Sequence, residues 1–185
     1  MMTLFRILCS CLLISANPLH ADNDKPFAEM NLNVHHDDEQ VLLDGTITYS
    51  FSDTALEALE NGLPLVVRTD IKVVRSSGWF WDTTLVSKSL SQQIQYAALS
   101  QQYLVKDIQT SLPKTFLTRD SAIDALGHVD DLSVVSVKAI LPDNQYKIKI
   151  KTWLDIESLP SPLRPLAYIS DKWRLESDWA QWPIK

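Results

Sequence analysis

The sequence predicts a mainly β (α+β) fold: a single antiparallel β-sandwich or strongly curved sheet with two short helices. Apolar and polar residues alternate with a period of two through much of the chain, which is typical of half-buried strands. Turn residues separate these runs at the spacing of hairpins. Only two segments carry helix signals, whereas a parallel α/β fold would need a helix after most strands.

The first expected element is a hairpin over residues 27–51. Apolar residues alternate with polar ones over 30–34 and again over 41–51. Residues 37–38 are both Asp, a residue that favours turns. The two runs are therefore expected to pair as antiparallel strands.

A short helix is expected to follow the hairpin. Thr54 and Glu57 have the spacing of a capping box, in which the hydroxyl and the carboxylate each accept a hydrogen bond from a free backbone N–H. Residues 61–62 are Asn-Gly, which is typical of a helix end. Residues 65–75 then alternate as a long strand.

The middle of the chain predicts two more strands and the second helix. The strands are expected over 83–90 and 92–105, where Ser and Gln blur the alternation. The helix is expected over 119–126, with Gly127 just past its end.

The last third of the chain predicts three strands. Residues 134–141 and 145–155 alternate strongly, and Pro-Asp-Asn at 142–144 favours a hairpin turn between them. The Pro-rich stretch 159–165 is expected to be extended, because each Pro fixes its own φ and biases its predecessor away from helix. A final strand is expected near 173–179.

Composition indicates one ordinary globular domain. The chain has 185 residues, of which 45% are hydrophobic and 22% charged, and its formal net charge is −6. Domains typically contain about 100–150 residues, so one domain is the default. Because nucleic-acid binding relies on clustered Lys and Arg, the acidic balance argues against it.

The N-terminus has the pattern of a secretory signal peptide over residues 1–21. Arg6 precedes an apolar run at 7–16, and Ala21 supplies the small residue before a cut. Cleavage near Ala16, or retention of the segment as an anchor, are the alternatives. The run is shorter than the roughly 20 apolar residues of a membrane-spanning helix, so no integral span is expected after cleavage.

Cleavage after Ala21 would leave residues 22–185 as the mature domain. Cys9 and Cys11 would leave with the signal, so the mature domain would contain no cysteine. An exported domain without disulfides must be stabilised by its core alone. A short signal and a lack of disulfides favour a bacterial periplasm.

Three consecutive aromatic residues, Trp79, Phe80 and Trp81, form a candidate partner surface. They lie in an expected turn between strands, and consecutive side chains cannot all face one core. Exposed aromatic residues mark partner, glycan or lipid surfaces. The alternative is that they cover an open end of the sheet. The other four Trp residues are expected to lie mainly in the core.

Three lysines, Lys147, Lys149 and Lys151, form a candidate anion-facing row. They alternate with apolar residues, so their ammonium groups are expected on one face of a strand. Such a row could bind anionic lipid, lipopolysaccharide or an acidic peptide. The alternative is a solvated face on which Lys discourages aggregation.

Other polar clusters carry weaker signals. His35 to Glu39 could supply metal ligands, but adjacent strand residues point to opposite faces, which favours a polar hairpin tip. His128 precedes two Asp residues near a helix end, where the helix dipole favours a His without any catalytic role. With only four Gly and no nucleophile motif, the sequence predicts no enzyme, no cofactor and no metal.

Several segments together resemble the bacterial DUF4390 family of exported proteins without assigned activity. The resemblance covers about residues 27–182 and rests on the ordered segments 55–65, Arg75 with 79–82, 96–103, Phe116 with 122–127, 154–163 and 173–179. It implies a bacterial envelope protein whose single domain fills the mature chain. It implies no catalytic residues.

These observations predict a non-catalytic periplasmic interaction module that binds another envelope or inner-membrane protein, such as a membrane-bound sensor. The alternative is a carrier of a lipid or small molecule that uses the space between the sheets, with the lysine row at its mouth. A hydrolase-like enzyme is the third hypothesis, for which His128 and an Asp would have to converge beside a deep pocket.

Overall fold

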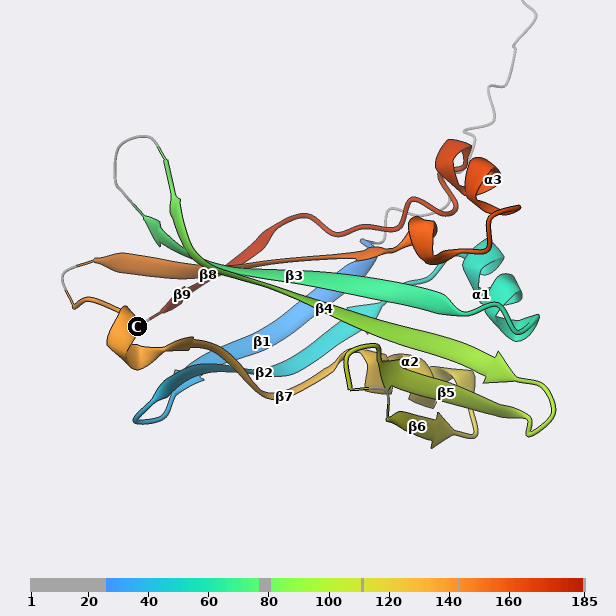
Figure 1. Ribbon diagram of the computed structural model, residues 1–185, viewed down its shortest axis with the longest axis horizontal. Coiled ribbons are helices and arrows are strands. Elements are labelled where there is room, and N and C mark those ends of the chain that lie inside the picture. Colours follow the sequence, from blue (N-terminus) through green and yellow to red (C-terminus); the bar gives the residue numbers. More distant parts are fainter. Residues whose placement is uncertain (1–25, 77–80, 111, 143, 185) are drawn as a thin grey trace, which may run out of the picture.

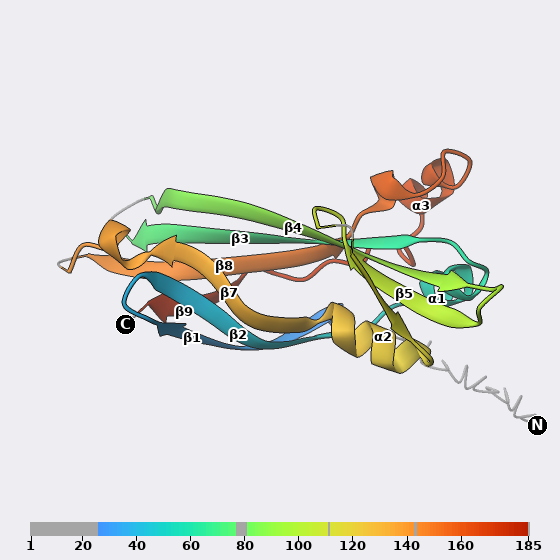
Figure 2. The same ribbon diagram turned by 60° about the horizontal axis from the view of Figure 1, so that its bottom comes forward.

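The protein is a two-layer antiparallel β-sandwich (Figures 1 and 2). The computed structural model describes residues 26–76, 81–110, 112–142 and 144–184. Sheet A has the strand order β1-β2-β7, and sheet B has the order β6-β5-β4-β3-β8-β9. Every pairing is antiparallel, so the predicted mainly β fold is confirmed.

The strands and helices have the following bounds. Sheet A contains β1 Ala28–His36, β2 Gln40–Tyr49 and β7 His128–Ser136. Sheet B contains β3 Leu65–Ser76, β4 Thr83–Ala97, β5 Gln102–Asp107, β6 Pro113–Phe116, β8 Gln145–Leu154 and β9 Ala180–Ile184. The helices are α1 Asp53–Glu60, α2 Arg119–Leu126 and α3 Arg164–Ile169, with short 3-10 turns η1 Val137–Ala139 and η2 Ile156–Ser158.

The core lies between the sheets and follows the predicted alternation. Leu43 on β2, Val73 on β3 and Ile148 on β8 are fully buried. A buried hydroxyl chain crosses this core: the Tyr49 hydroxyl lies 3.4 Å from Thr152 Oγ1, which lies 3.0 Å from Thr69 Oγ1. Because Thr152 Oγ1 also donates to the Arg68 carbonyl, these polar groups are paired inside the apolar layer.

Helix α2 covers the end of the sandwich beneath β5, as Figure 2 shows. Its residues Ala122 and Leu126 are buried. The backbone of Gly127, at its C-terminus, lies directly against β2: the Ile47 N–H donates to the Gly127 carbonyl at 2.8 Å. The predicted helix 119–126 is therefore confirmed, and its end is fixed to sheet A.

The start of α1 differs from the prediction. The capping residue is Ser52, whose Oγ accepts a hydrogen bond from the Ala55 N–H, whereas Thr54 lies inside the helix. Ser52 Oγ also donates to the Lys172 carbonyl at 2.6 Å. The prediction was wrong by two residues because both Ser and Thr suit the capping position and only the tertiary contact distinguishes them.

Two predicted strand boundaries are wrong in the middle of the chain. Residues 83–97 form one strand, β4, and the turn comes at 98–101, where Gln101 has a φ of 53°. Strand β7 begins at His128 rather than at residue 134. In both places polar residues hide the alternation, and in β7 an irregular pairing with β2 interrupts it.

The predicted hairpin between 134–141 and 145–155 is also wrong. Strand β7 pairs with β2 in sheet A, while β8 pairs with β3 in sheet B. The connection between them therefore passes from one sheet to the other through η1, and alternation alone does not say which sheet a strand joins.

The C-terminal third differs from the prediction in two elements. The Pro-rich stretch is not fully extended, because α3 begins at Arg164 with a Pro in its first turn, a position that a helix tolerates. The two predicted helices thus become three. The last strand is β9 at Ala180–Ile184, later than predicted, and residue Glu176 makes only an isolated bridge to Trp153. Trp173 is buried in the core.

Candidate functional site

The outer face of sheet B carries a group of lysines. Register places Lys149 beside Lys72 of β3, with Lys147 and Lys151 two residues away on either side along β8. Their neighbours Ile148 and Ile150 are buried toward sheet A, so the lysines point away from it. We call Lys72, Lys147, Lys149 and Lys151 the basic face.

Acidic and aromatic side chains already contact part of the basic face. Lys149 Nζ forms an ion pair with Asp82, and Lys151 Nζ lies 2.8 Å from a Glu176 carboxylate oxygen. Lys72 Nζ lies 4.6 Å from the centre of the Trp179 ring, a cation–π contact. Lys147 makes no ion pair with any residue that the structure describes.

The contact with Lys149 changes the acidity of Asp82. The hydrogen bond from the Lys149 ammonium lowers the pKa of the Asp82 carboxyl below its ordinary value, and the charges of Lys149 and Lys147 act in the same direction. Asp82 therefore stays ionised at neutral pH, and the ion pair is present there. It is lost only as the pH falls through the lowered pKa.

The two predicted candidate sets meet at this ion pair. Trp81 directly precedes Asp82 and is 82% exposed. Trp79 and Phe80 lie outside the described residues. The end of β3 and the starts of β4 and β8 lie at the same end of the molecule (Figure 1). The structure thus brings Trp81 beside the lysine row, which the sequence alone did not indicate.

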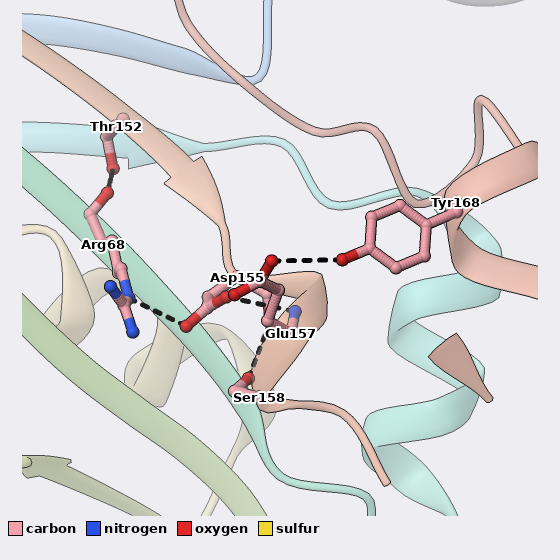
Figure 3. A network of polar contacts seen from close by, with 6 residues as sticks. All are labelled: Arg68, Thr152, Asp155, Glu157, Ser158 and Tyr168. Atoms are coloured by element: carbon pink, nitrogen blue, oxygen red, sulfur yellow. Dashed lines mark hydrogen bonds and ion pairs between the residues drawn. The ribbon is translucent and has the colours of Figure 1, made fainter. Parts of the chain in front are cut away.

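A polar network at the opposite end of sheet B fixes the segment that leads to Glu176 (Figure 3). Arg68 Nε on β3 lies 2.8 Å from a carboxylate oxygen of Asp155, whose side chain is 9% exposed. Ser158 Oγ donates to the Asp155 carbonyl, and the Tyr168 hydroxyl donates to Glu157. That hydrogen bond raises the pKa of Tyr168. The network therefore joins β3 to η2 and α3.

Hydrogen bonds within the turn stabilise the predicted polar hairpin tip at residues 35–39. Asp37 Oδ1 accepts from the backbone N–H groups of Gln40 at 2.6 Å and Glu39 at 2.7 Å. These two hydrogen bonds lower the pKa of Asp37. His35 and His36 do not converge, because His36 Nδ1 lies near the Asp37 carbonyl and His35 contacts other residues.

His128 lies at the edge of a cavity of about 190 Å³ between the sheets. Tyr49 and Thr69 line this cavity together with apolar residues, and Asp107 and Asp130 also line it. Among the described residues, no hydrogen bond or ion pair joins His128 to a carboxylate. The lysine row does not line this cavity, which contradicts the expectation that the row would form the mouth of an inter-sheet carrier site.

Comparison with known proteins identifies the family to which this chain belongs. A family model described as a domain of unknown function, DUF4390, matches residues 25–183. This chain belongs to the DUF4390 family. The match covers nearly the whole chain and confirms the resemblance inferred from the ordered sequence segments.

Further comparisons add no activity to this DUF4390 protein. No curated protein and no solved structure matches the chain. Within the described ranges, the DUF4390 domain contains no helix long and apolar enough to cross a membrane.

Proposed function

We propose that this DUF4390 protein is a non-catalytic periplasmic module that binds another envelope protein through the outer face of sheet B. One observation carries the proposal: the basic face adjoins the exposed Trp81 at one end of the sheet. Lysines and an aromatic side chain on one surface supply both charge and apolar contact area for a partner.

The charge of the basic face argues for an acidic partner segment. Lysines at alternate positions of β8 are about 6.6–6.8 Å apart along the strand, since each strand residue rises 3.3–3.4 Å. An extended segment with carboxylates at alternate positions has the same spacing. Asp82 and Glu176 already contact Lys149 and Lys151, so carboxylates fit this surface. The proposed partner is therefore an acidic, extended segment of a membrane-bound envelope protein such as a sensor.

The location of the protein is part of the proposal. The N-terminal pattern over residues 1–21 supports export, and a domain without cysteine after Ala21 suits a periplasm in which stability comes from the core. A partner in the envelope follows from that location.

The alternative function, a carrier of a lipid or small molecule, would require the cavity between the sheets to hold the ligand. Its volume of about 190 Å³ is below the roughly 300–1,000 Å³ of typical ligand pockets. An engineered cavity of about 150 Å³ holds a molecule of the size of benzene, so a lipid chain exceeds this space. The cavity therefore favours a small ligand at most, and the interaction module has the stronger support.

The proposed role is tested by the variant W79A/W81A. We expect it to fold normally and to lose at least one envelope protein captured by cross-linking in living cells. Leu99→Ala is the matched control, because Leu99 is a fully exposed apolar residue at the β4–β5 turn. If W79A/W81A folds and retains every cross-linked partner, the aromatic residues are not the binding surface.

A further inference from the structure

Three polar side chains from three neighbouring strands meet on the outer face of sheet A. They are His35 on β1, Asp44 on β2 and Asp131 on β7. His35 Nδ1 lies 3.3 Å from Asp44 Oδ2, and His35 Nε2 lies 3.4 Å from Asp131 Oδ1. One ligand atom from each residue lies within 4.8 Å of the other two.

An irregular strand pairing positions Asp131 in this group. Leu43 pairs with Leu132 and Gly45 pairs with Val129, so β7 has one more residue than β2 between these pairs. This is the arrangement of a β-bulge, which redirects a side chain. Asp131 has a φ of 43°, which is uncommon for a residue with a side chain. The bulge thus turns a carboxylate toward the imidazole of His35.

Gly45 on β2 allows β1 to approach β2 closely beside Asp44. Its φ is 133°, and a Cβ there would lie 2.2 Å from the Asn31 carbonyl oxygen. Only glycine fits this position without a shift of β1 or β2. The close approach of β1 helps to bring His35 to the two carboxylates of the neighbouring strands.

The chemistry of the group suits a metal cation. A neutral imidazole has one N–H donor and one lone pair, so it can donate to only one of the two carboxylates. The other carboxylate then faces a lone pair, and the two carboxylates repel each other. A second proton on the imidazole removes this conflict, and so does a metal cation that accepts the imidazole lone pair and both carboxylates. His35 and Asp131 are exposed enough for their side chains to rotate toward a shared ion.

We propose that His35, Asp44 and Asp131 form a binding site for a divalent transition-metal ion of the Zn²⁺ class. Imidazole nitrogen and carboxylate oxygen are ligands that zinc takes, and water completes the coordination. The bound ion joins all three strands of sheet A. The site is independent of the basic face, which lies on the other sheet.

This proposal differs from the sequence-based expectation that the chain binds no metal. That expectation considered the consecutive residues His35 to Glu39, which cannot converge. Asp44 and Asp131 are distant in the sequence and reach His35 only through the order of strands in sheet A and the bulge in β7.

The site is tested by zinc titration of the full-length chain. Cys9→Ser and Cys11→Ser are introduced in every sample so that these thiols do not bind the ion, and metal is removed with a chelator. Isothermal calorimetry is expected to show one zinc ion per chain. NMR of backbone amides is expected to show shifts concentrated in β1, β2 and β7 around the three ligands.

Three variants decide whether these residues are the ligands. His35→Ala and Asp131→Asn are each expected to weaken zinc binding at least about 10-fold. His36→Ala is the matched control, because its side chain leaves the strand on the opposite face and contacts the Asp37 carbonyl. Circular dichroism verifies that all variants fold. The proposal is wrong if the parent chain binds no zinc, or if His35→Ala or Asp131→Asn binds it as tightly as the parent.

Discussion

Replacing Gly127 by alanine is expected to destabilise the fold by at least about 3 kcal/mol, a large share of the roughly 5–15 kcal/mol that stabilises a domain. A Cβ at this position would lie 1.7 Å from the Ile47 carbonyl oxygen. The atoms that this Cβ would meet all belong to the Ile47 backbone, so no side chain can move aside. Relief requires α2 to separate from β2, which breaks the 2.8 Å hydrogen bond from the Ile47 N–H to Gly127.

Urea unfolding, monitored by circular dichroism, measures this loss of stability. Gly62→Ala is the matched control, because a Cβ there would lie 3.6 Å from the Tyr96 carbonyl oxygen, which is an ordinary van der Waals contact. Gly62 has a φ of 83°, so its replacement still costs about 1–2 kcal/mol of backbone strain. Equal losses in the two variants would show that α2 is not held against β2 as described.

The double charge reversal K72E/K147E is expected to weaken partner binding about 100-fold. Neither lysine forms an ion pair with a described residue, so both charges are available to a partner. An exposed ion pair contributes about 0.2–1 kcal/mol, and a reversal replaces attraction by repulsion of similar size. With about 0.7 kcal/mol for the attraction and the same for the repulsion, the change is about 1.4 kcal/mol, or about 10-fold, for each lysine.

Titration of the cross-linked partner, once purified, against each variant measures this loss. K114E/K138E is the matched control, since it makes the same change in net charge at exposed lysines of β6 and η1. The basic-face variant should also lose most of the salt dependence of binding, whereas the control should keep it. An equal loss of affinity in both variants would indicate that only net charge matters.

Local sequence signals predicted the elements whose patterns are uninterrupted. The hairpin over 27–51, the strand at 65–75 and the helix at 119–126 all appear in the structure. Each combines a clear period with a turn or capping residue at its end. Where Ser and Gln replace apolar residues on a strand, as in β4, the period is lost and the boundary with it.

The sequence alone did not predict which distant segments contact each other. The bulge at Asp131 interrupts the alternation of β7, and nothing local assigns β7 and β8 to different sheets. The lysine row was predictable because alternation on β8 is strict. Its position beside Trp81 depends on the Asp82–Lys149 contact, and the meeting of His35 with Asp131 depends on the strand order of sheet A.

Site-specific photo-cross-linking in living cells tests whether the outer face of sheet B contacts an envelope protein. Ser87 is exposed and lies in register with Lys72, so a photoreactive residue there samples the basic face. Thr48 is exposed on the outer face of sheet A and serves as the control. We predict a discrete cross-linked envelope protein from position 87 and none from position 48. A cross-link from position 48 alone, or from neither position, would show that the outer face of sheet B does not contact an envelope protein.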